Sequence, residues 1–209
     1  MSTEEVLYTK CDEKYEMLLE IDSLHDESKN YTTGFYAPYV PSSYYFLEKF
    51  LNDYFIKKTD IFVDFGCGKG RVPILLNYLS SCKSIGVEYD KNLYKFAMNN
   101  KKNYEKKYGI KNVDFIHEKA ENVLIPENAS IFYFYNPFSI IIFARVIRNI
   151  LKSNKNNEFT IILFRPIIEY CKFLETSNGF ELFNILEYES ADKVRNDIVF
   201  YVYKYKKQI

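Results

Sequence analysis

The chain has 209 residues, but it lacks tryptophan and has only two histidines and four cysteines. The cysteines are scattered and form no Cys-x-x-Cys pair, at Cys11, Cys67, Cys82 and Cys171. We therefore expect neither a structural zinc site nor a disulfide framework, and a cytoplasmic, reducing location. Lysine plus arginine and aspartate plus glutamate both number 28, for a net charge of zero. That balance argues against a nucleic acid partner, because nucleic-acid-binding domains are usually basic.

Long apolar runs are also missing. No run approaches the roughly 18 residues of a membrane helix, so we expect no membrane contact. Residues 1–5 are acidic and lack an apolar core, which argues against a signal peptide. Residues 1–41 are expected to form an acidic helical segment followed by a tyrosine-rich loop (residues 31–43 at its widest) that could fold over a ligand as a lid. Residues 42–209 are long enough for one domain.

From residue 42 onward, strand and helix patterns alternate. Short apolar runs predict strands at 61–65, 84–88, 113–116, 131–135 and 159–164. Amphipathic stretches predict helices at about 41–55, 71–79, 90–108, 139–151 and 167–176. Two final strands, 180–188 and 198–205, have no helix between them. The pattern predicts an α/β fold with a doubly wound, mostly parallel seven-stranded sheet, helices on both faces and an antiparallel C-terminal strand.

Residues that cap helices support these boundaries. Ser42 or Ser43 is expected to cap the first helix of the domain, and Asp90 the helix that Gly109 ends. In a doubly wound sheet, ligands bind beyond the carboxyl ends of the strands. The strand that ends near Asp64 therefore marks the expected site.

Three of the seven glycines fall between that strand and the next helix, as Gly66, Gly68 and Gly70. Glycine lets a backbone approach a ligand closely, so the loop is expected to cradle a nucleotide-like molecule. It is not the dinucleotide fingerprint, because Arg71 occupies the third glycine position, and no Gly-Lys-Ser/Thr follows for a P-loop. Lys69 and Arg71 could be phosphate ligands, but we favour solvent-facing positions at the helix start.

Residues 63–70, Val-Asp-Phe-Gly-Cys-Gly-Lys-Gly, resemble the first motif of class I S-adenosylmethionine (SAM)-dependent methyltransferases. Gly86-Val87-Glu88 resembles their second motif, and the resemblance covers about residues 42–205. It implies that Asp64 faces the ammonium group of SAM and that Glu88 accepts hydrogen bonds from the ribose hydroxyls. The implied cofactor-binding residues of these two motifs are Asp64, Gly66, Cys67, Gly68, Gly70, Glu88 and Tyr89.

The third motif departs from the family's Gly-Asp-Ala-like turn. Glu118-Lys119-Ala120-Glu121 aligns there, and a lysine cannot accept a hydrogen bond from the adenine amino group. The contact therefore falls to Glu118, to Glu121 or to the backbone around Ala120.

Tyr135-Asn136-Pro137-Phe138 lies where the family places its fourth motif. It resembles the Asn/Asp-Pro-Pro-Tyr/Phe motif of methyltransferases that act on amino nitrogens, with one proline missing. The resemblance implies that Tyr135 and Asn136 adjoin the cofactor, and that Asn136, a carbonyl beside Pro137 and Phe138 hold the acceptor. The alternative is a strand end at which Asn136 caps the next helix. His117 could be a base, although a structural role is favoured.

Gly86-Val87-Glu88 also resembles the non-SET histone lysine methyltransferase family, whose Asn-Asn-Phe motif Asn136-Pro137-Phe138 does not match. We predict methyl transfer from SAM, with S-adenosylhomocysteine as product, to an amino nitrogen of a protein or small molecule. A non-catalytic SAM- or S-adenosylhomocysteine-binding module is the main alternative. A nucleic-acid methyltransferase and a NAD-dependent oxidoreductase, which Arg71 disfavours, rank lower.

Overall fold

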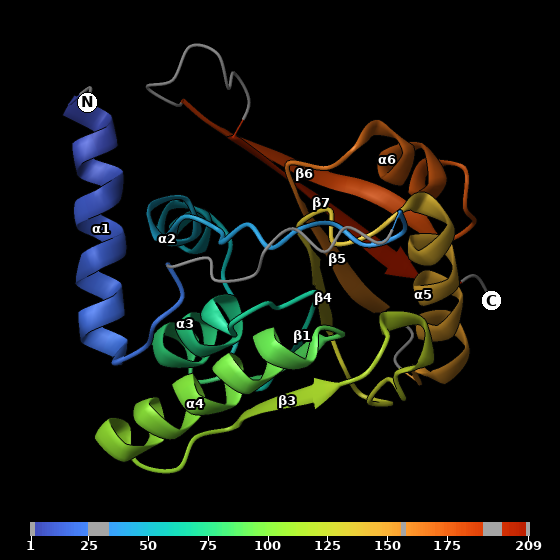
Figure 1. Ribbon diagram of the computed structural model, residues 1–209. Coiled ribbons are helices and arrows are strands. Elements are labelled where there is room, and N and C mark those ends of the chain that lie inside the picture. The colour runs from blue at the N-terminus through green and yellow to red at the C-terminus, as the bar shows by residue number, and fades with distance from the viewer. Residues whose placement is uncertain (1–2, 25–33, 156–157, 190–197, 208–209) are drawn as a thin grey trace.

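A computed structural model describes residues 3–24, 34–155, 158–189 and 198–207 (Figure 1). Seven strands form one sheet in the order β3-β2-β1-β4-β5-β7-β6. The strands are β1 (Ile61–Phe65), β2 (Lys83–Glu88), β3 (Val113–His117), β4 (Ile131–Phe134), β5 (Glu158–Phe164), β6 (Phe180–Tyr188) and β7 (Ile198–Lys206). The first five are parallel, while β7 runs antiparallel to both β5 and β6. The predicted sheet is confirmed.

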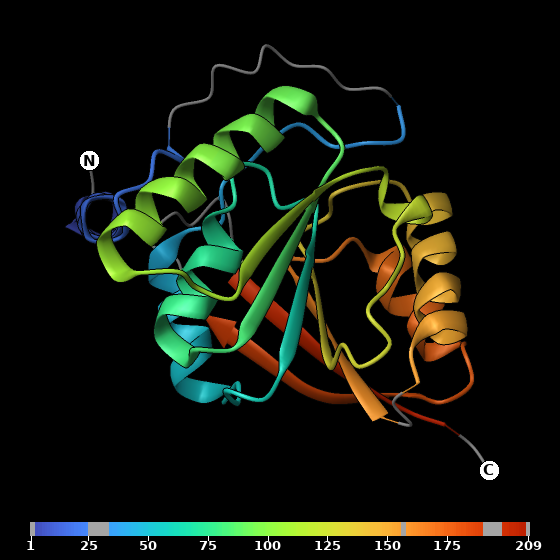
Figure 2. The same cartoon turned by 90° about the horizontal axis from the view of Figure 1, so that it is seen from below.

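Helices cover both faces of the sheet (Figures 1 and 2). They are α1 (Thr3–Leu19), α2 (Tyr44–Asp53), α3 (Arg71–Ser80), α4 (Lys91–Tyr108), η1 (Ala120–Asn122), α5 (Ile140–Ser153) and α6 (Ile168–Glu175). Helices α2, α3 and α4 share one core with the inner face of α1, whereas η1, α5 and α6 share the other. Among the described residues, no helix has the length and apolarity needed to cross a bilayer.

The sequence explains the regular elements. The central strands β1, β4 and β5 are almost continuously apolar and buried, as expected where helices cover both faces. Helix α5 buries one apolar stripe at Ile142, Phe143, Val146, Ile147 and Ile150. The predicted start and end of α4 are confirmed. The Asp90 carboxylate accepts the backbone N–H groups of Asn92 and Leu93, and Gly109 follows the last turn with φ of 79°.

The prediction of a serine at the N-cap of α2 is confirmed in position, but the expected capping hydrogen bond is wrong. Ser43 occupies the N-cap position, but its side chain makes no capping hydrogen bond, and the Ser42 hydroxyl lies 3.3 Å from the Tyr133 hydroxyl. Instead, Asp12 on α1 accepts the backbone N–H of Tyr44 at 3.0 Å. The cap therefore comes from a residue distant in the sequence, which a local pattern cannot reveal.

Strand register gathers the acidic residues at one edge of the sheet. Asp64 pairs with Gly86 across β1 and β2 and with Tyr133 across β1 and β4. Glu88 is the last residue of β2. Because parallel strands end at a common edge, the side chains at the ends of β1, β2 and β4 can face one ligand.

Candidate functional site

A cavity of about 570 Å³ lies beyond the carboxyl ends of β1, β2 and β4. That volume is typical of small-molecule sites. Most of the predicted site residues line it, namely Asp64, Gly66, Cys67, Glu88, Tyr89, Ala120, Tyr135, Asn136, Pro137 and Phe138. Three predicted site residues, Gly68, Gly70 and Glu121, are not part of its lining. The sequence-based selection therefore converges on one place in the fold.

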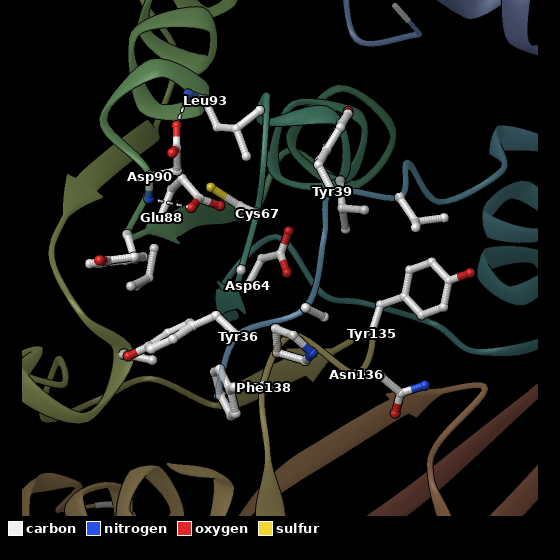
Figure 3. Close-up of a pocket in the computed structure, with 18 of the residues that line it drawn as sticks. Tyr36, Tyr39, Asp64, Cys67, Glu88, Asp90, Leu93, Tyr135, Asn136 and Phe138 are labelled. Carbon is white, nitrogen blue, oxygen red and sulfur yellow. Dashed lines mark hydrogen bonds between the residues drawn. The ribbon is translucent and has the colours of Figure 1, made fainter. Parts of the chain in front are cut away.

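Asp64 points into the middle of this cavity (Figure 3). It is only 3% exposed, and among the described residues no group donates a hydrogen bond to its carboxylate. Burial, and then the nearby Glu88 carboxylate, raise the pKa of Asp64 well above its ordinary value. A buried carboxylate without a protein partner fits a cationic group of a ligand.

Glu88 ties the glycine loop to the end of β2. Its Oε2 accepts the Gly68 N–H at 2.8 Å and its Oε1 accepts the Asp90 N–H at 2.7 Å. Burial raises the pKa of Glu88, and these two N–H donors partly offset the rise. Each carboxylate oxygen keeps further acceptor capacity, so Glu88 can still accept ligand hydroxyls.

Each glycine of the loop lies against a different protein group. Gly66, Gly68 and Gly70 have positive φ values of 81°, 55° and 84°. A Cβ would come within 2.4 Å of Pro137 at Gly66, within 2.1 Å of the Tyr39 ring at Gly68, and within 2.4 Å of the Phe115 ring at Gly70. Only Gly66 borders the cavity. The need for glycine is therefore set by packing and backbone conformation as much as by a ligand.

The expectation that Lys69 and Arg71 face solvent is wrong, since they are only 1% and 2% exposed. The Lys69 ammonium lies 4.3 Å from the centre of the Phe96 ring. The Arg71 guanidinium stacks on the Tyr44 ring at 4.3 Å and donates to groups of the N-terminal segment. These acceptors are Ser23 Oγ (2.7 Å), the Ser42 carbonyl (2.7 Å), Asp12 Oδ2 (3.2 Å) and Glu16 Oε1 (3.3 Å). Arg71 thus holds α1 and the segment after it against α3.

We call residues 34–42 the strap, and residues 36–42 of the strap line the cavity. Two backbone hydrogen bonds fix the strap to the turn after β4, from Ala37 N to the Pro137 carbonyl (3.0 Å) and from Ser139 N to the Phe35 carbonyl (2.8 Å). The loop predicted from the tyrosine-rich stretch began at residue 31, and residues 31–33 lie outside the described residues. The tyrosine-rich pattern predicted this loop, but none of its residues was among the predicted site residues.

Two tyrosines of the strap contact the predicted motifs. The Tyr36 ring stacks on the Tyr89 ring with centroids 4.9 Å apart, and its hydroxyl donates to Glu121 Oε2 at 2.6 Å. The Tyr39 ring lies against Gly68, and its hydroxyl donates to the Ser23 carbonyl at 2.8 Å.

The third motif offers two carboxylates in different settings. Glu121 is bonded to Tyr36, whereas Glu118 is exposed, borders the cavity and accepts the Lys119 N–H at 2.8 Å. Ala120 is buried between them and lines the cavity.

The fourth motif is tied to its surroundings. Asn136 has a φ of 45°, its Nδ2 donates to the Arg165 carbonyl at 2.5 Å, and its Oδ1 accepts the Ile167 N–H at 3.0 Å. The capping alternative for Asn136 is wrong, because Ser139 is the residue at the N-cap of α5. Phe138 is 4% exposed, with its ring edge-on to those of Tyr36 and Phe134.

His117 lies outside the cavity lining. Its ring stacks on Tyr94 at 5.1 Å, and its Nε2 lies 3.1 Å from the Tyr89 carbonyl. These contacts agree with the structural role favoured for this histidine.

The sequence matches one family of known proteins. The sequence model of the family described as "Histone methylation protein DOT1" matches residues 18–204. No curated protein matches the sequence.

Several solved structures share the fold. A precorrin-6y C5,15-methyltransferase from Geobacter metallireducens has a TM-score of 0.61 and 15% identity, covering 83% of this chain and 93% of that one. An RNA methyltransferase from Salinibacter ruber, in complex with S-adenosyl-L-homocysteine, has a TM-score of 0.60 and 16% sequence identity. The match covers 81% of this chain and 96% of that one. The human methyltransferase 10 domain containing protein has a TM-score of 0.60 and 11% sequence identity, and the match covers 97% of each chain.

Proposed function

The chain belongs to the family of the histone methylation protein DOT1 and is a SAM-dependent methyltransferase; from this premise, we propose that the cavity at the ends of β1, β2 and β4 is its SAM site. The observation that carries this proposal is Asp64, a buried carboxylate that faces the cavity with no hydrogen-bond donor among the described residues. The ammonium group of SAM would supply the missing partner.

Other residues fit the remaining parts of the same ligand. Glu88 keeps free lone pairs for two ribose hydroxyls while it holds the Gly68 N–H. Gly66 brings backbone to the cavity wall without a side chain in the way. Tyr89 and Ala120 border the same cavity beyond Glu88, where the base would lie.

SAM, when bound, supplies an electrophilic methyl group and its own leaving group. The task of the chain is to bind, to orient and to exclude water. The strap and the turn at Asn136 enclose the cavity and can perform the last of these tasks.

For the acceptor, we propose an amino nitrogen, with a protein amine as the first candidate because the family is described by histone methylation. The Pro137 carbonyl and Asn136 Oδ1 each accept one hydrogen bond within the protein. Both are oxygens with a second lone pair, which could accept from the target amine. Phe138 is buried under Tyr36, so stacking on a flat acceptor would require the strap to move.

Transfer of labelled methyl groups from SAM to separated protein, RNA and small-molecule fractions of a cell lysate tests the acceptor. We expect label in protein, stable to base as an N-methyl group is. Label in RNA or small molecules alone would contradict the protein assignment.

Calorimetry tests the cofactor site. We expect SAM and S-adenosylhomocysteine to bind at micromolar strength, about −8 kcal/mol, and NAD not to bind. Micromolar NAD binding without SAM binding would overturn the proposed site.

A further inference from the structure

The base end of the proposed SAM site already holds an aromatic ring. Tyr89 follows Glu88, the proposed ribose acceptor, and Glu121 is one of the two carboxylates available to a base amino group. Tyr36 contacts both, stacking on Tyr89 with an interplanar angle of 24° and donating its hydroxyl to Glu121. One side chain therefore engages both an aromatic ring and a carboxylate that a base could use.

The contact between Tyr36 and Tyr89 leaves no space for a second ring between them. Its centroid lies 4.9 Å from that of Tyr89, which is the spacing of a direct aromatic pair. The Phe138 ring meets it edge-on at 6.1 Å and 79°. Tyr36 thus has a stacking partner, an edge partner and a hydrogen-bond acceptor, the three kinds of contact that a purine base with an amino group would make. Figure 3 shows Tyr36 and Phe138 together on the side of the cavity away from Tyr39.

We propose that Tyr36 is an internal competitor for the base of SAM, which binds only after Tyr36 has left Tyr89 and Glu121. Glu121 then exchanges the Tyr36 hydroxyl for the base amino group as its donor. This inference rests on the proposed function, because it places the base of SAM at Tyr89.

Movement of Tyr36 requires little of the rest of the protein. Gly34, Phe35, Ala37 and Pro38, which flank it, are exposed, so few packing contacts oppose a local shift. The backbone hydrogen bonds of Phe35 and Ala37 to the turn after β4 can stay in place when only the Tyr36 side chain rotates away. Tyr39 is anchored separately, on Gly68 and on the Ser23 carbonyl. The Tyr36 side chain can therefore leave Tyr89 and Glu121 while Tyr39 and the Arg71 contacts stay in place.

The Tyr36→Ala and Tyr36→Phe variants test the competition. Alanine removes the ring and the hydroxyl, whereas phenylalanine removes only the hydrogen bond to Glu121. If the free site is open about one tenth of the time, Tyr36→Ala tightens S-adenosylhomocysteine binding by about tenfold, because apparent affinity scales with the open fraction. Tyr36→Phe should fall between Tyr36→Ala and wild type. Adenosine, measured in parallel as a probe of the base end, should show the same order.

Tyr94→Ala is the matched control. Tyr94 also stacks on a ring, that of His117, but it does not line the cavity. Its replacement should leave affinity for S-adenosylhomocysteine unchanged. Thermal unfolding of each variant checks that the fold persists.

The outcomes separate this inference from the proposed site. If wild type binds S-adenosylhomocysteine normally and Tyr36→Ala binds it with unchanged or lower affinity, the competition is overturned and the proposed site is not. Lower affinity would mean that Tyr36 supports the wall of the site. If neither wild type nor any variant binds S-adenosylhomocysteine, the proposed SAM site fails and the competition fails with it.

Discussion

The carboxylate of Glu88 accepts the backbone N–H of Gly68 at 2.8 Å, so the acid at the end of β2 and the glycine loop after β1 form one unit. The other carboxylate oxygen accepts the Asp90 N–H, where α4 begins. Gly66 and Cys67 donate to the Val87 carbonyl at 2.9 and 3.0 Å. A substitution at Glu88 should therefore alter the conformation of the glycine loop, which borders the proposed SAM site.

Glu88→Gln should destabilise the ligand-free protein, because the hydrogen bond that it loses outweighs the removal of a buried charge whose pKa burial raises. A glutamine has only one oxygen acceptor, so its amide nitrogen would face one of the two backbone N–H donors. Leaving such a group unsatisfied costs about 1–3 kcal/mol. Urea unfolding measures this loss, and an unchanged midpoint and slope would show that the two hydrogen bonds contribute nothing to stability.

Asp64→Asn should have the opposite effect on the ligand-free protein. Aspartate titrates near 3.9 in unfolded chains, and burial raises the pKa of Asp64 in the folded protein. The folded state therefore binds more protons between these two pKa values, and stability falls as pH rises through that window. Asparagine removes this loss. Thermal unfolding at a series of pH values should show a Tm gain that grows from about pH 4 upward.

The same Asp64→Asn variant should bind SAM more weakly. A hydrogen bond to a charged group is worth about 1.5–3 kcal/mol, which corresponds to roughly a 10- to 100-fold loss of affinity. Calorimetry measures this loss of affinity. A variant that is less stable and binds SAM normally would contradict the role proposed for Asp64.

Arg71→Met should loosen the N-terminal segment. The substitution leaves Asp12 and Glu16 without their buried cation, and breaking such a pair costs about 3–5 kcal/mol. Urea unfolding measures the loss, and limited proteolysis should cut before α2 in the variant first. Lys101→Met, which breaks the partly exposed pair with Asp114, is the control and should cost under about 1 kcal/mol. Equal losses in the two variants would contradict the anchoring role of Arg71.

Gly68→Ala should act through Tyr39. Its Cβ would meet the Tyr39 ring at 2.1 Å, and the left-handed backbone at φ of 55° adds about 1–2 kcal/mol for any residue with a Cβ. In a Tyr39→Ala background the clash is gone and only the backbone cost remains. A double-mutant cycle on unfolding free energies measures the difference. Simple additivity would contradict the contact as the cause.

Asn136→Ala should lower turnover without loss of SAM binding. Alanine removes the side-chain oxygen that we propose accepts from the target amine, together with the hydrogen bonds to the Ile167 N–H and the Arg165 carbonyl. We also expect a stability loss of about 1–3 kcal/mol from the unsatisfied carbonyl. Single-turnover methyl transfer at saturating SAM separates the two effects, and normal turnover would rule out a catalytic role for Asn136.

Much of the fold could be predicted because its signals are local. The apolar runs at β1 and β4, the Asp90 cap and Gly109 each depend on neighbours within one turn or strand. The cavity lining was predictable for a related reason. Parallel strands end at one edge, so Asp64, Glu88 and Tyr135 had to converge.

The sequence-based predictions that were wrong share a physical cause: the residues concerned have partners distant in the sequence. Arg71 and Lys69 follow the glycine loop and read as polar residues at a helix start, but α1 supplies carboxylates that make burial of Arg71 favourable. The α2 cap came from Asp12 for the same reason. Nothing near Tyr36 in the sequence indicates that its hydroxyl reaches Glu121.

The Arg71 contacts also constrain the order of events during synthesis. Asp12 and Glu16 precede Arg71 by 59 and 55 residues, so the ribosome adds them several seconds earlier at about 5–20 residues per second. The ion pairs of α1 with Arg71 can therefore form only after β1 and the start of α3 have emerged from the ribosome, and the carboxylates of α1 stay hydrated until then. Docking of the first helix should consequently be a late step in folding, governed by closure of a long loop rather than by helix formation.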